Sequence, residues 1–511
     1  MLLLLLGSAQ VSAGGLTIPG AGPHGQARAG AFVAKADDPS ALLYNPAGFA
    51  KIDGTHFTLG VNMVNFDQEF QRAGSYEATP DSNPFEGERY PLVRDTSKPS
   101  FGLGGYQAIP FIGISTDLGH PEWPVRFGIG LNSIQGYVER KYPRRVDING
   151  VSAPAPQRYD VVSQSAAPIR PSIAVAYSLN DKINLGLRLG WGILRVAGSR
   201  SSWSVANYSE REDFDTFFDV TDGVDAFVPT YGLGMTYRLS DNIEFGAEYS
   251  SEFRGNAVGN GLSEGGDVGL GPFEILPVDD EAAGCAPGGQ PGALKACVEV
   301  GIPRRATVGA RYVLRDESGL EKADLEFDVR WENYASVKNS RIIVDGRDSI
   351  TGQSLNPGQS RSGFHDVFSF RLGGAYRLKA GSAGITLRGG VAHDTSTAPD
   401  GFLRLDKDGK ARTTLATGVG IDVGRFRVDL GGGIVLEQDV EIAQCKPETN
   451  GPTVNDRGCG TNGVDRPISE RTGPDPLQPK LAESAALENP FNAGTIKSGY
   501  LMMSLGISTR F

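Results

Sequence analysis

The sequence predicts an all-β chain that folds as a 14-stranded antiparallel transmembrane β-barrel with an N-terminal hatch, or plug, inside the lumen. Three observations support this fold: a strict two-residue alternation over residues 500–511, fourteen segments with the same period, and connections that alternate between long and short. Successive side chains of a strand point to opposite faces of its sheet, so a two-residue period indicates strands.

The last twelve residues (YLMMSLGISTRF) give the clearest alternation. Leu501, Met503, Leu505 and Ile507 share one face, which nothing later in the chain can bury. Lipid around a closed barrel accounts for that face, and an edge strand of a soluble sandwich is the alternative. The aromatic Phe511 is similar to the last-strand signal of bacterial outer-membrane barrels, which the barrel assembly machinery reads.

Fourteen period-two segments follow one another along the chain, and their number is even. Odd-to-even connections are long and even-to-odd connections are short, as at 180–182 and 239–242. Short periplasmic turns and long external loops are typical of an outer-membrane barrel. The predicted strands are 54–66, 108–117, 125–133, 171–179, 183–196, 226–238, 243–254, 304–315, 323–334, 364–378, 384–393, 411–423, 425–437 and 498–511.

The ninth predicted strand orients the faces of the barrel. An arginine that faces lipid at midplane costs about 2–4 kcal/mol and a carboxylate somewhat less, so its charges must face the lumen. The fifth strand divides in the same way, with leucines against Asn184 and Arg188. The charged residues of the ninth strand are Asp324, Glu326, Asp328, Arg330 and Glu332.

Composition excludes other classes of protein. The chain has 511 residues, 39% of them hydrophobic, and 69 glycines, and it holds no apolar run near the roughly 18 residues that a spanning helix requires. The net charge of −11, with no basic stripe, argues against a nucleic-acid partner. We therefore expect one repetitive domain over 54–511.

The N-terminus predicts export. Leu2 to Leu6 form a short apolar core, and Val11-Ser12-Ala13 supply the small residues that a signal peptidase reads, so residues 1–13 are expected to be a signal peptide. No positive residue precedes Leu2, and we therefore expect the true start codon to lie upstream. The alternative is a short apolar N-terminus on a cytosolic protein.

Four cysteines fall in two close pairs, Cys285 with Cys297 and Cys445 with Cys459, within loop-like stretches. Two disulfides are expected in an oxidising compartment, each closing a loop of about 15 residues and worth roughly 3 kcal/mol. A zinc site is the alternative, but neither pair has a nearby histidine or a CxxC spacing. We therefore expect no metal and no cofactor.

The segment 14–53 is expected to fill the lumen. A ring of fourteen strands encloses more space than wall side chains fill, and this segment precedes the first strand at the periplasmic end. Small residues suit close packing, and Phe32, Leu43 and Tyr44 add apolar groups. A disordered periplasmic tail is the alternative.

The stretch GQARAGAFVAKADDPSALLYNPAGFAKIDG resembles the N-terminal hatch of the FadL/TodX (OmpP1) family of outer-membrane channels for long-chain fatty acids and other hydrophobic compounds. The correspondence is Ala36-Asp37-Asp38 followed, after six residues, by Asn45-Pro46-Ala47. It covers about 30 residues, and the strand count extends it to the whole chain only as architecture. The resemblance implies capture by external loops, a pocket against the hatch, and lateral release into the outer membrane through a gap in the third strand, for which Gly128 and Gly130 are candidates.

Several residues are candidate ligand contacts, although packing is the alternative for each apolar one. For a fatty carboxylate we expect Arg188 and Arg330, which lie on predicted inward faces. Structural ion pairs with Asp324, Asp328 or Asp37 are the alternative. The apolar candidates are Leu16, Ile18, Pro19, Phe32, Leu43 and Tyr44.

Three other functions compete with uptake of a hydrophobic small molecule by a monomeric barrel set in outer-membrane lipids. A water-filled porin would lack a working hatch. A purely structural or adhesive barrel would bind no acyl or aromatic ligand. An enzyme is not expected, because the five histidines are accompanied by neither a GxSxG elbow nor a His/Glu cluster with metal-ligand spacing.

Overall fold

The computed structural model describes residues 22–76, 83–98, 102–133, 139–203, 215–265, 275–277, 294–337, 339–348, 358–361, 364–398, 404–406, 409–442 and 494–511. The predicted signal peptide and the ligand candidates Leu16, Ile18 and Pro19 lie outside these residues.

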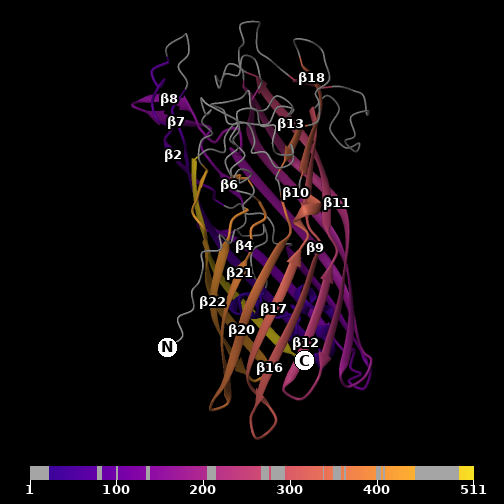
Figure 1. The fold of residues 1–511 in the computed structure, drawn as a ribbon. Helices are drawn as coiled ribbons and strands as arrows, with labels where there is room; N and C mark the ends of the chain where they lie inside the picture. The colour runs from indigo at the N-terminus through magenta and orange to yellow at the C-terminus, as the bar shows by residue number, and fades with distance from the viewer. Residues whose placement is uncertain are drawn as a thin grey trace, which may run out of the picture.

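The strands close into one antiparallel barrel (Figure 1), which confirms the all-β, 14-stranded prediction. Each wall strand pairs with the next, and β1 closes the ring by pairing with β25 along its whole 17-residue length. Two successive strands can share one position in the wall. β12 and β13 both pair with β11, and on their other side β12 pairs with β16 and β13 with β15. The wall strands are β1 (His56–Arg72), β4 (Tyr106–Thr116), β5 (Val125–Ser133), β9 (Ser163–Ser178), β10 (Ile183–Trp203), β11 (Asp215–Arg238), β12 (Ile243–Ser250), β13 (Phe253–Gly265), β15 (Leu294–Ile302), β16 (Arg305–Arg315), β17 (Glu321–Glu332), β20 (Val367–Ala380), β21 (Ala383–Asp394), β22 (Arg412–Val423), β23 (Phe426–Glu437) and β25 (Gly494–Arg510).

The two ends of the barrel differ, as predicted. Short turns join β9 to β10, β11 to β12 and β20 to β21 at one end, where the C-terminus also lies (Figure 1). The long connections carry the remaining short elements. These are β2 (Leu92–Arg94), β3 (Gly102–Leu103), β6 (Arg140–Lys141), β7 (Arg145–Ile148), β8 (Val151–Pro154), β14 (Ile275–Pro277), η5 (Tyr334–Val337), β18 (Asn339–Asp348), β19 (Gly358–Arg361) and β24 (Val440–Ile442).

Several strands run further than the predicted segments, chiefly away from the short turns. β11 begins at Asp215 rather than at 226, and the predicted strand 243–254 is divided into β12 and β13. The inward face changes from Ser250 to Phe253 across that division, and Pro303 interrupts the neighbouring strand because it has no N–H to donate. Irregular alternation of this kind hides a strand from a search for strict period two.

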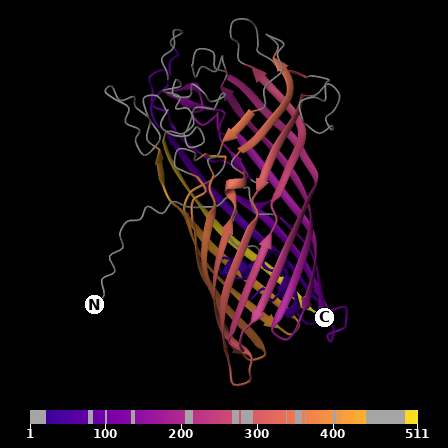
Figure 2. The ribbon, with the colours of Figure 1, turned by 45° about the vertical axis from the view of Figure 1, so that its right-hand side comes forward.

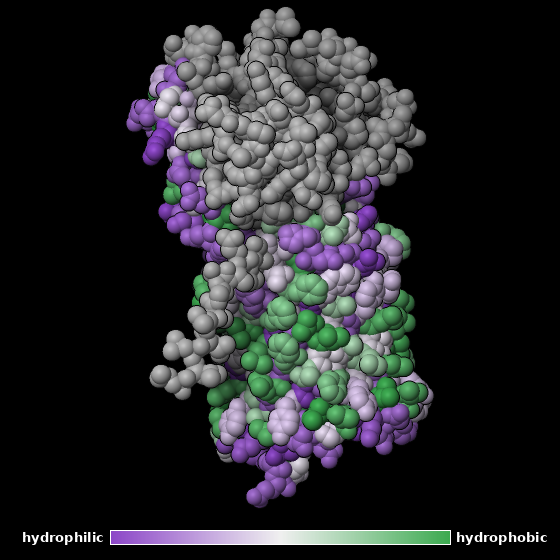
Figure 3. Space-filling view, viewed as in Figure 1, coloured by the Kyte–Doolittle hydropathy of each residue, from purple (hydrophilic) through white to green (hydrophobic). Residues whose placement is uncertain are grey.

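The faces agree with the predictions. Asp324, Glu326 and Asp328 of β17 are buried inside, whereas Leu325 and Phe327 are about half exposed outside. In the last strand Ser504 is buried and Leu505 exposed. On the face shown in Figure 3, apolar residues form a band across the lower half of the barrel, with hydrophilic residues above and below it. No helix among the described residues is long and apolar enough to cross a membrane.

The N-terminal segment, which we define as residues 22–53, lies inside the lower part of the barrel (Figure 2). It holds three short helices, α1 (Pro23–Ala27), α2 (Ala41–Tyr44) and η1 (Pro46–Lys51). α1 contacts β21, β22, β23 and β25, whereas η1 contacts β5, β9, β10 and β11. The segment thus reaches across the bore from one side of the wall to the other.

Substitution of arginine for Leu187 tests the membrane placement, because Leu187 faces outward in the middle of the apolar run of β10. We expect Leu187→Arg to lower the free energy of unfolding in lipid vesicles by about 2–4 kcal/mol. Leu239→Arg, in the turn that follows β11, is the matched control, with an expected loss of about 0–1 kcal/mol. Equal losses in urea titrations would contradict a bilayer around β10.

Candidate functional site: the lumen around the N-terminal segment

Inward-facing glycines form the bed on which the N-terminal segment rests. A Cβ added to Gly186 of β10 would lie 2.2 Å from the backbone nitrogen of Ala47, and one added to Gly234 of β11 would lie 2.1 Å from Asn45 Oδ1. On the opposite wall, a Cβ on Gly506 would lie 2.4 Å from Pro23. Contacts this short leave room for hydrogen alone, so the wall and the segment have complementary shapes.

The predicted hatch motif lies at the centre of this bed. The Asn45 side chain donates to the carbonyl oxygens of Val33 at 2.8 Å and of Met235 in β11 at 2.9 Å. Its oxygen accepts from the backbone N–H of Ala47 at 3.1 Å, which caps η1, and Pro46 occupies the first helical position. Asn45 therefore ties the segment both to itself and to the wall.

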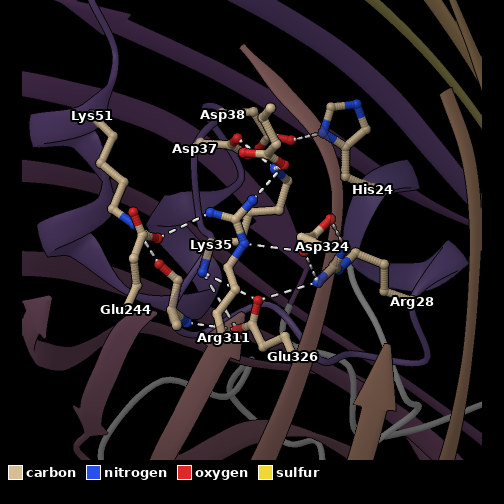
Figure 4. A network of polar contacts seen from close by, with 12 residues as sticks. His24, Arg28, Lys35, Asp37, Asp38, Lys51, Glu244, Arg311, Asp324 and Glu326 are labelled. Carbon is tan, nitrogen blue, oxygen red and sulfur yellow. Dashed lines mark hydrogen bonds and ion pairs between the residues drawn. The ribbon is translucent and has the colours of Figure 1, made fainter. Parts of the chain in front are cut away.

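Buried ion pairs join the segment to the inward face of the wall (Figure 4). Arg28 lies 2.7 Å from Asp324 and 3.2 Å from Glu326, and all three side chains are fully buried. Arg311 of β16 lies 3.0 Å from both Asp324 and Glu244. A buried charge left without its partner costs several kcal/mol, so these pairs determine where the segment can rest.

A second acidic group binds backbone rather than side chains. Asp328 accepts from the N–H groups of Phe32 at 2.9 Å and Val33 at 3.1 Å, and Glu326 accepts from Ala34 at 2.6 Å. Buried N–H groups outside regular structure require such partners. The carboxylates of the ninth predicted strand thus mainly bind the N-terminal segment.

Two further cations of the segment complete the network in Figure 4. Lys51 lies 2.9 Å from Glu244, and Lys35 lies 2.6 Å from Glu321 and 3.0 Å from Asp37. Burial opposes the ionisation of Asp37, but Lys35 and Arg311 outweigh it and lower the pKa of that carboxyl. Asp37 of the predicted motif is therefore an ionised group beside Lys35, and Asp38 accepts hydrogen bonds from the N–H and the hydroxyl of Ser40.

The apolar candidates of the segment pack against one another. Phe32 is fully buried and its ring meets that of Tyr44 edge to face at 5.3 Å, and Leu43 belongs to the same apolar cluster. These contacts favour the packing alternative stated for the apolar candidates.

Five arginines form an arc on the inner wall beside α2. Arg188 donates to the carbonyl oxygen of Leu42 at 2.6 Å, and Arg305 to that of Leu43 at 2.7 Å. The positive charges of these arginines repel one another. Arg188 and Arg305 repel the guanidinium of Arg170, and Arg371 and Arg305 repel that of Arg330. We call Arg170, Arg188, Arg305, Arg330 and Arg371 the arginine arc.

Three members of the arginine arc form no close ion pair in the described part of the chain, although Glu248 attracts all three from a greater distance. Arg305 and Arg371 each have a carboxylate at 3.6 Å, from Glu248 and Asp394 respectively. Within the described part of the chain, no carboxylate lies within 4.0 Å of Arg170, Arg188 or Arg330. Arg188 and Arg330 bond instead to Ser250 and Thr307. The alternative of ion pairs with Asp324, Asp328 or Asp37 is not seen among the described residues, since Arg28, the segment's backbone and Lys35 bind those carboxylates.

Arg170 and Arg305 were not among the predicted site residues. Arg170 immediately precedes the predicted strand 171–179, and β9 in fact begins at Ser163. Extending the inward face of that strand by one step would have included it.

The glycines proposed for a lateral gap make room for the segment. A Cβ on Gly128 would lie 2.3 Å from the Phe49 ring, and one on Gly130 would lie 2.7 Å from Leu42. β5 pairs through both glycines with β4 and with β9, in an unbroken register. The predicted gap at these positions stays a prediction.

The remaining predicted residues are placed as follows. Phe511 is 72% exposed, and its N–H donates to the Thr55 carbonyl oxygen at 2.9 Å. Cys297 is buried in β15. Cys285, Cys445 and Cys459 lie outside the described residues, so both disulfides stay predictions. Within the described ranges, no group of three or more His, Cys, Asp and Glu side chains could hold a metal ion.

The fit between glycine and segment can be tested at Gly186. We expect Gly186→Val to displace residues 45–47 and to destabilise the seated segment by about 1–3 kcal/mol, because the new side chain meets backbone. Gly389→Val is the control, since a Cβ there meets no atom closer than 3.9 Å. Protease cleavage within residues 22–53 should become faster in the first variant only.

Comparisons with known proteins agree with this architecture. The model of the family described as outer membrane protein transport protein (OMPP1/FadL/TodX) matches residues 4–455. A protein of Neisseria meningitidis serogroup B that bears the name of an outer membrane protein is 22% identical over 438 residues, covering 83% of this chain and 87% of that protein.

Solved structures show the same fold at low identity. A Pseudomonas aeruginosa FadL homologue superposes with a TM-score of 0.68 at 15% identity, covering 98% of this chain and all of that one. The Ralstonia pickettii toluene transporter TbuX gives 0.58 at 17% identity, covering 96% of this chain and 99% of that one. The Pseudomonas putida toluene transporter TodX gives 0.57 at 15% identity, with the same coverage. The chain therefore belongs to the OMPP1/FadL/TodX family of outer membrane transport proteins, a family of channels for hydrophobic compounds.

Proposed function

We propose that this channel takes up long-chain fatty acids or similar hydrophobic compounds, with a preference for those that carry a carboxylate. External loops capture the ligand, a pocket above the N-terminal segment holds it, and it leaves sideways through the wall. The observation that carries this proposal is the arginine arc. Three buried guanidinium groups that form no close ion pair among the described residues lie on the inner wall, where an anionic head group would find hydrogen-bond donors.

Apolar patches on the lumenal face suit the rest of such a ligand. Leu194, Val228 and Phe253 belong to one cluster on β10, β11 and β13; Arg188 also lies on β10, and Arg170 lies on the neighbouring β9. Val64 and Tyr500 belong to another, on β1 and β25. Removing a methylene from water stabilises the bound state by about 0.8 kcal/mol, so a long acyl chain would bind such walls firmly.

Capture by external loops would take place at the opposite end of the barrel from the short turns. Phe70, Tyr142 and Tyr334 belong to a buried apolar cluster built mainly from the long connections and the far ends of the strands. The cluster packs these connections together at the mouth, where the proposal places the first contact of a hydrophobic ligand.

For sideways release we propose a second candidate opening besides Gly128 and Gly130. β11 pairs with its neighbours at Gly232↔Ser250 and again at Val224↔Val258, in the same register. Of the seven residues between these pairs, Tyr231 accepts a backbone hydrogen bond from Ser251 and the Asp225 carboxylate accepts from the Asn256 N–H. In the described part of the chain, residues 226–230 have no ladder partner across that seam, and Pro229 among them lacks an N–H. Phe227 is 62% exposed on the outer side of this seam.

Other features are consistent with a transporter rather than an enzyme. We propose a monomer in outer-membrane lipids, with Phe511 as the signal for the barrel assembly machinery. We also retain the predictions of a signal peptide over 1–13, a hatch over 14–53 and two disulfides. A water-filled porin is the alternative, and the N-terminal segment discriminates between the two.

Deletion of residues 22–53 should open the bore. If the N-terminal segment is a working hatch, the truncated barrel should show a large ionic conductance in planar bilayers, whereas the intact chain should show little. A porin would conduct with or without the segment. Unchanged conductance, in a truncated protein that still folds into membranes, would reject the hatch.

Removing a charge from the arginine arc should weaken binding of carboxylates selectively. No carboxylate of the described residues lies within 4.0 Å of Arg170, so Arg170→Gln breaks no close ion pair. We expect the Kd for a long-chain carboxylate to rise about 10- to 100-fold, and the Kd for the matching neutral alcohol to change little.

Arg238→Gln, in an exposed arginine beside the turn that follows β11, is the control for this measurement. Equal losses for the carboxylate and the alcohol would contradict recognition of the head group, while leaving transport of neutral compounds open.

A further inference from the structure

His24 of α1 lies between two carboxylates from different parts of the molecule. Its Nε2 lies 2.9 Å from Oδ2 of Asp429 in β23, and its Nδ1 is in contact with Oδ2 of Asp38 in the N-terminal segment. The His24 side chain is 12% exposed, and Asp429 is almost fully buried. One ring thus connects the segment's own loop, the helix α1 and the barrel wall.

The protonation of the ring follows from this geometry. A carboxylate can only accept, and a neutral imidazole carries a proton on one nitrogen alone. Two carboxylate contacts are satisfied together only by the doubly protonated, positively charged ring. In the neutral ring, one nitrogen lone pair would face a carboxylate oxygen.

We propose that His24 is a proton-operated latch, which holds α1 against the wall when it is charged and frees it when it is neutral. This role concerns the seating of the N-terminal segment, and it holds whatever compound the channel carries. The moving part would be α1 with the loop around Asp38, since both lose a partner at the same time.

His24 can exchange protons with water on the side of the short turns. It lines a cavity of about 340 Å³, together with Asp38, Arg427 and Arg510. His56 and Asp422 line the same cavity. Because the short turns mark the periplasmic end, the latch would respond to periplasmic pH.

The groups that face His24 come from every element packed on α1. Asp429 also lies 2.9 Å from Arg388 of β21 and 3.0 Å from Arg427 of β23, so it keeps two cations when His24 is neutral. Among the residues that the structure describes, Asp38 then keeps only the N–H and hydroxyl of Ser40. The Asp38 side of the latch should therefore open first. β22, β25 and β1 contribute Asp422, Arg510 and His56 to the cavity rim.

Rising pH opens the His24 latch. Burial and Arg388 oppose the charge on His24, but Asp429 and Asp38 outweigh them and raise the pKa of His24 above its ordinary value of 6.5. The folded protein therefore binds the proton more tightly than the unlatched ring does. The latch is complete below about pH 6.5 and is lost as the pH rises through the raised pKa.

α1 is a helix that could leave and return. It contains five residues, and glycines of the wall lie against it, including Gly418 against Ala27 and Gly506 against Pro23. Such a short helix has little stability of its own, so its position depends on side-chain anchors. His24 and Arg28 are the charged residues within and beside it.

Hydrogen exchange of the full chain in lipid nanodiscs provides the test. Protection factors would be measured for the amides of Gln26, Ala29 and Gly30, whose N–H groups are bonded within the segment. Between about pH 5 and about pH 9 we expect protection to fall with rising pH, by up to tenfold for each unit between the ordinary and the raised pKa.

Three variants separate the latch from other causes. His24→Gln should show weak protection that no longer depends on pH, and Asp38→Asn should move the midpoint to lower pH. His56→Gln, which alters the other histidine of the cavity, should keep the native profile.

Two results would overturn the proposal: a native pH profile in His24→Gln, or an unmoved midpoint in Asp38→Asn. If His24→Gln does not insert into membranes, NMR titration of the His24 ring in the native chain decides. We expect protons on both ring nitrogens at low pH, and a singly protonated ring throughout would reject the latch.

Discussion

A ring of fourteen strands encloses more space than its own side chains can fill, and the rest of the structure depends on this constraint. The N-terminal segment occupies part of that space, and the wall has given up side chains to admit it. Gly186, Gly234 and Gly506 each lie so close to the segment that a Cβ would overlap it. Lumen and segment are thus two halves of one packed core inside a membrane barrel.

Ion pairs and hydrogen bonds to carboxylates fix the position of the N-terminal segment within this packing. Arg28 of the segment enters a buried acidic site on β17, and Asp328 and Glu326 receive the backbone N–H groups of residues 32–34. Because those carboxylates are occupied, Arg170, Arg188 and Arg330 form no close ion pair with any residue that the structure describes. The same arrangement that holds the segment in place leaves a cationic surface facing the bore, which suits an anionic head group.

The sequence predicted the architecture well because strand periodicity is a local property. Alternation showed the faces of β10, β17 and β25, and the order of long and short connections showed the two ends of the barrel. Prediction was weaker where the alternation slips, as between β12 and β13, and where residues matter through distant partners. Arg170 lay one residue beyond a predicted strand, and the glycines of the bed looked like any others in a chain with 69 of them.

By itself, then, the sequence determined that fourteen strands form, which side of each faces lipid, and which segment precedes them, because hydrophobic pattern and turn chemistry act over a few residues. Only the tertiary structure decided which charges meet. Asp324 pairs with Arg28 from 296 residues away, and His24 meets Asp429 across 405 residues. Such contacts depend on strand register and on the docking of the segment, and no local pattern in the chain records them.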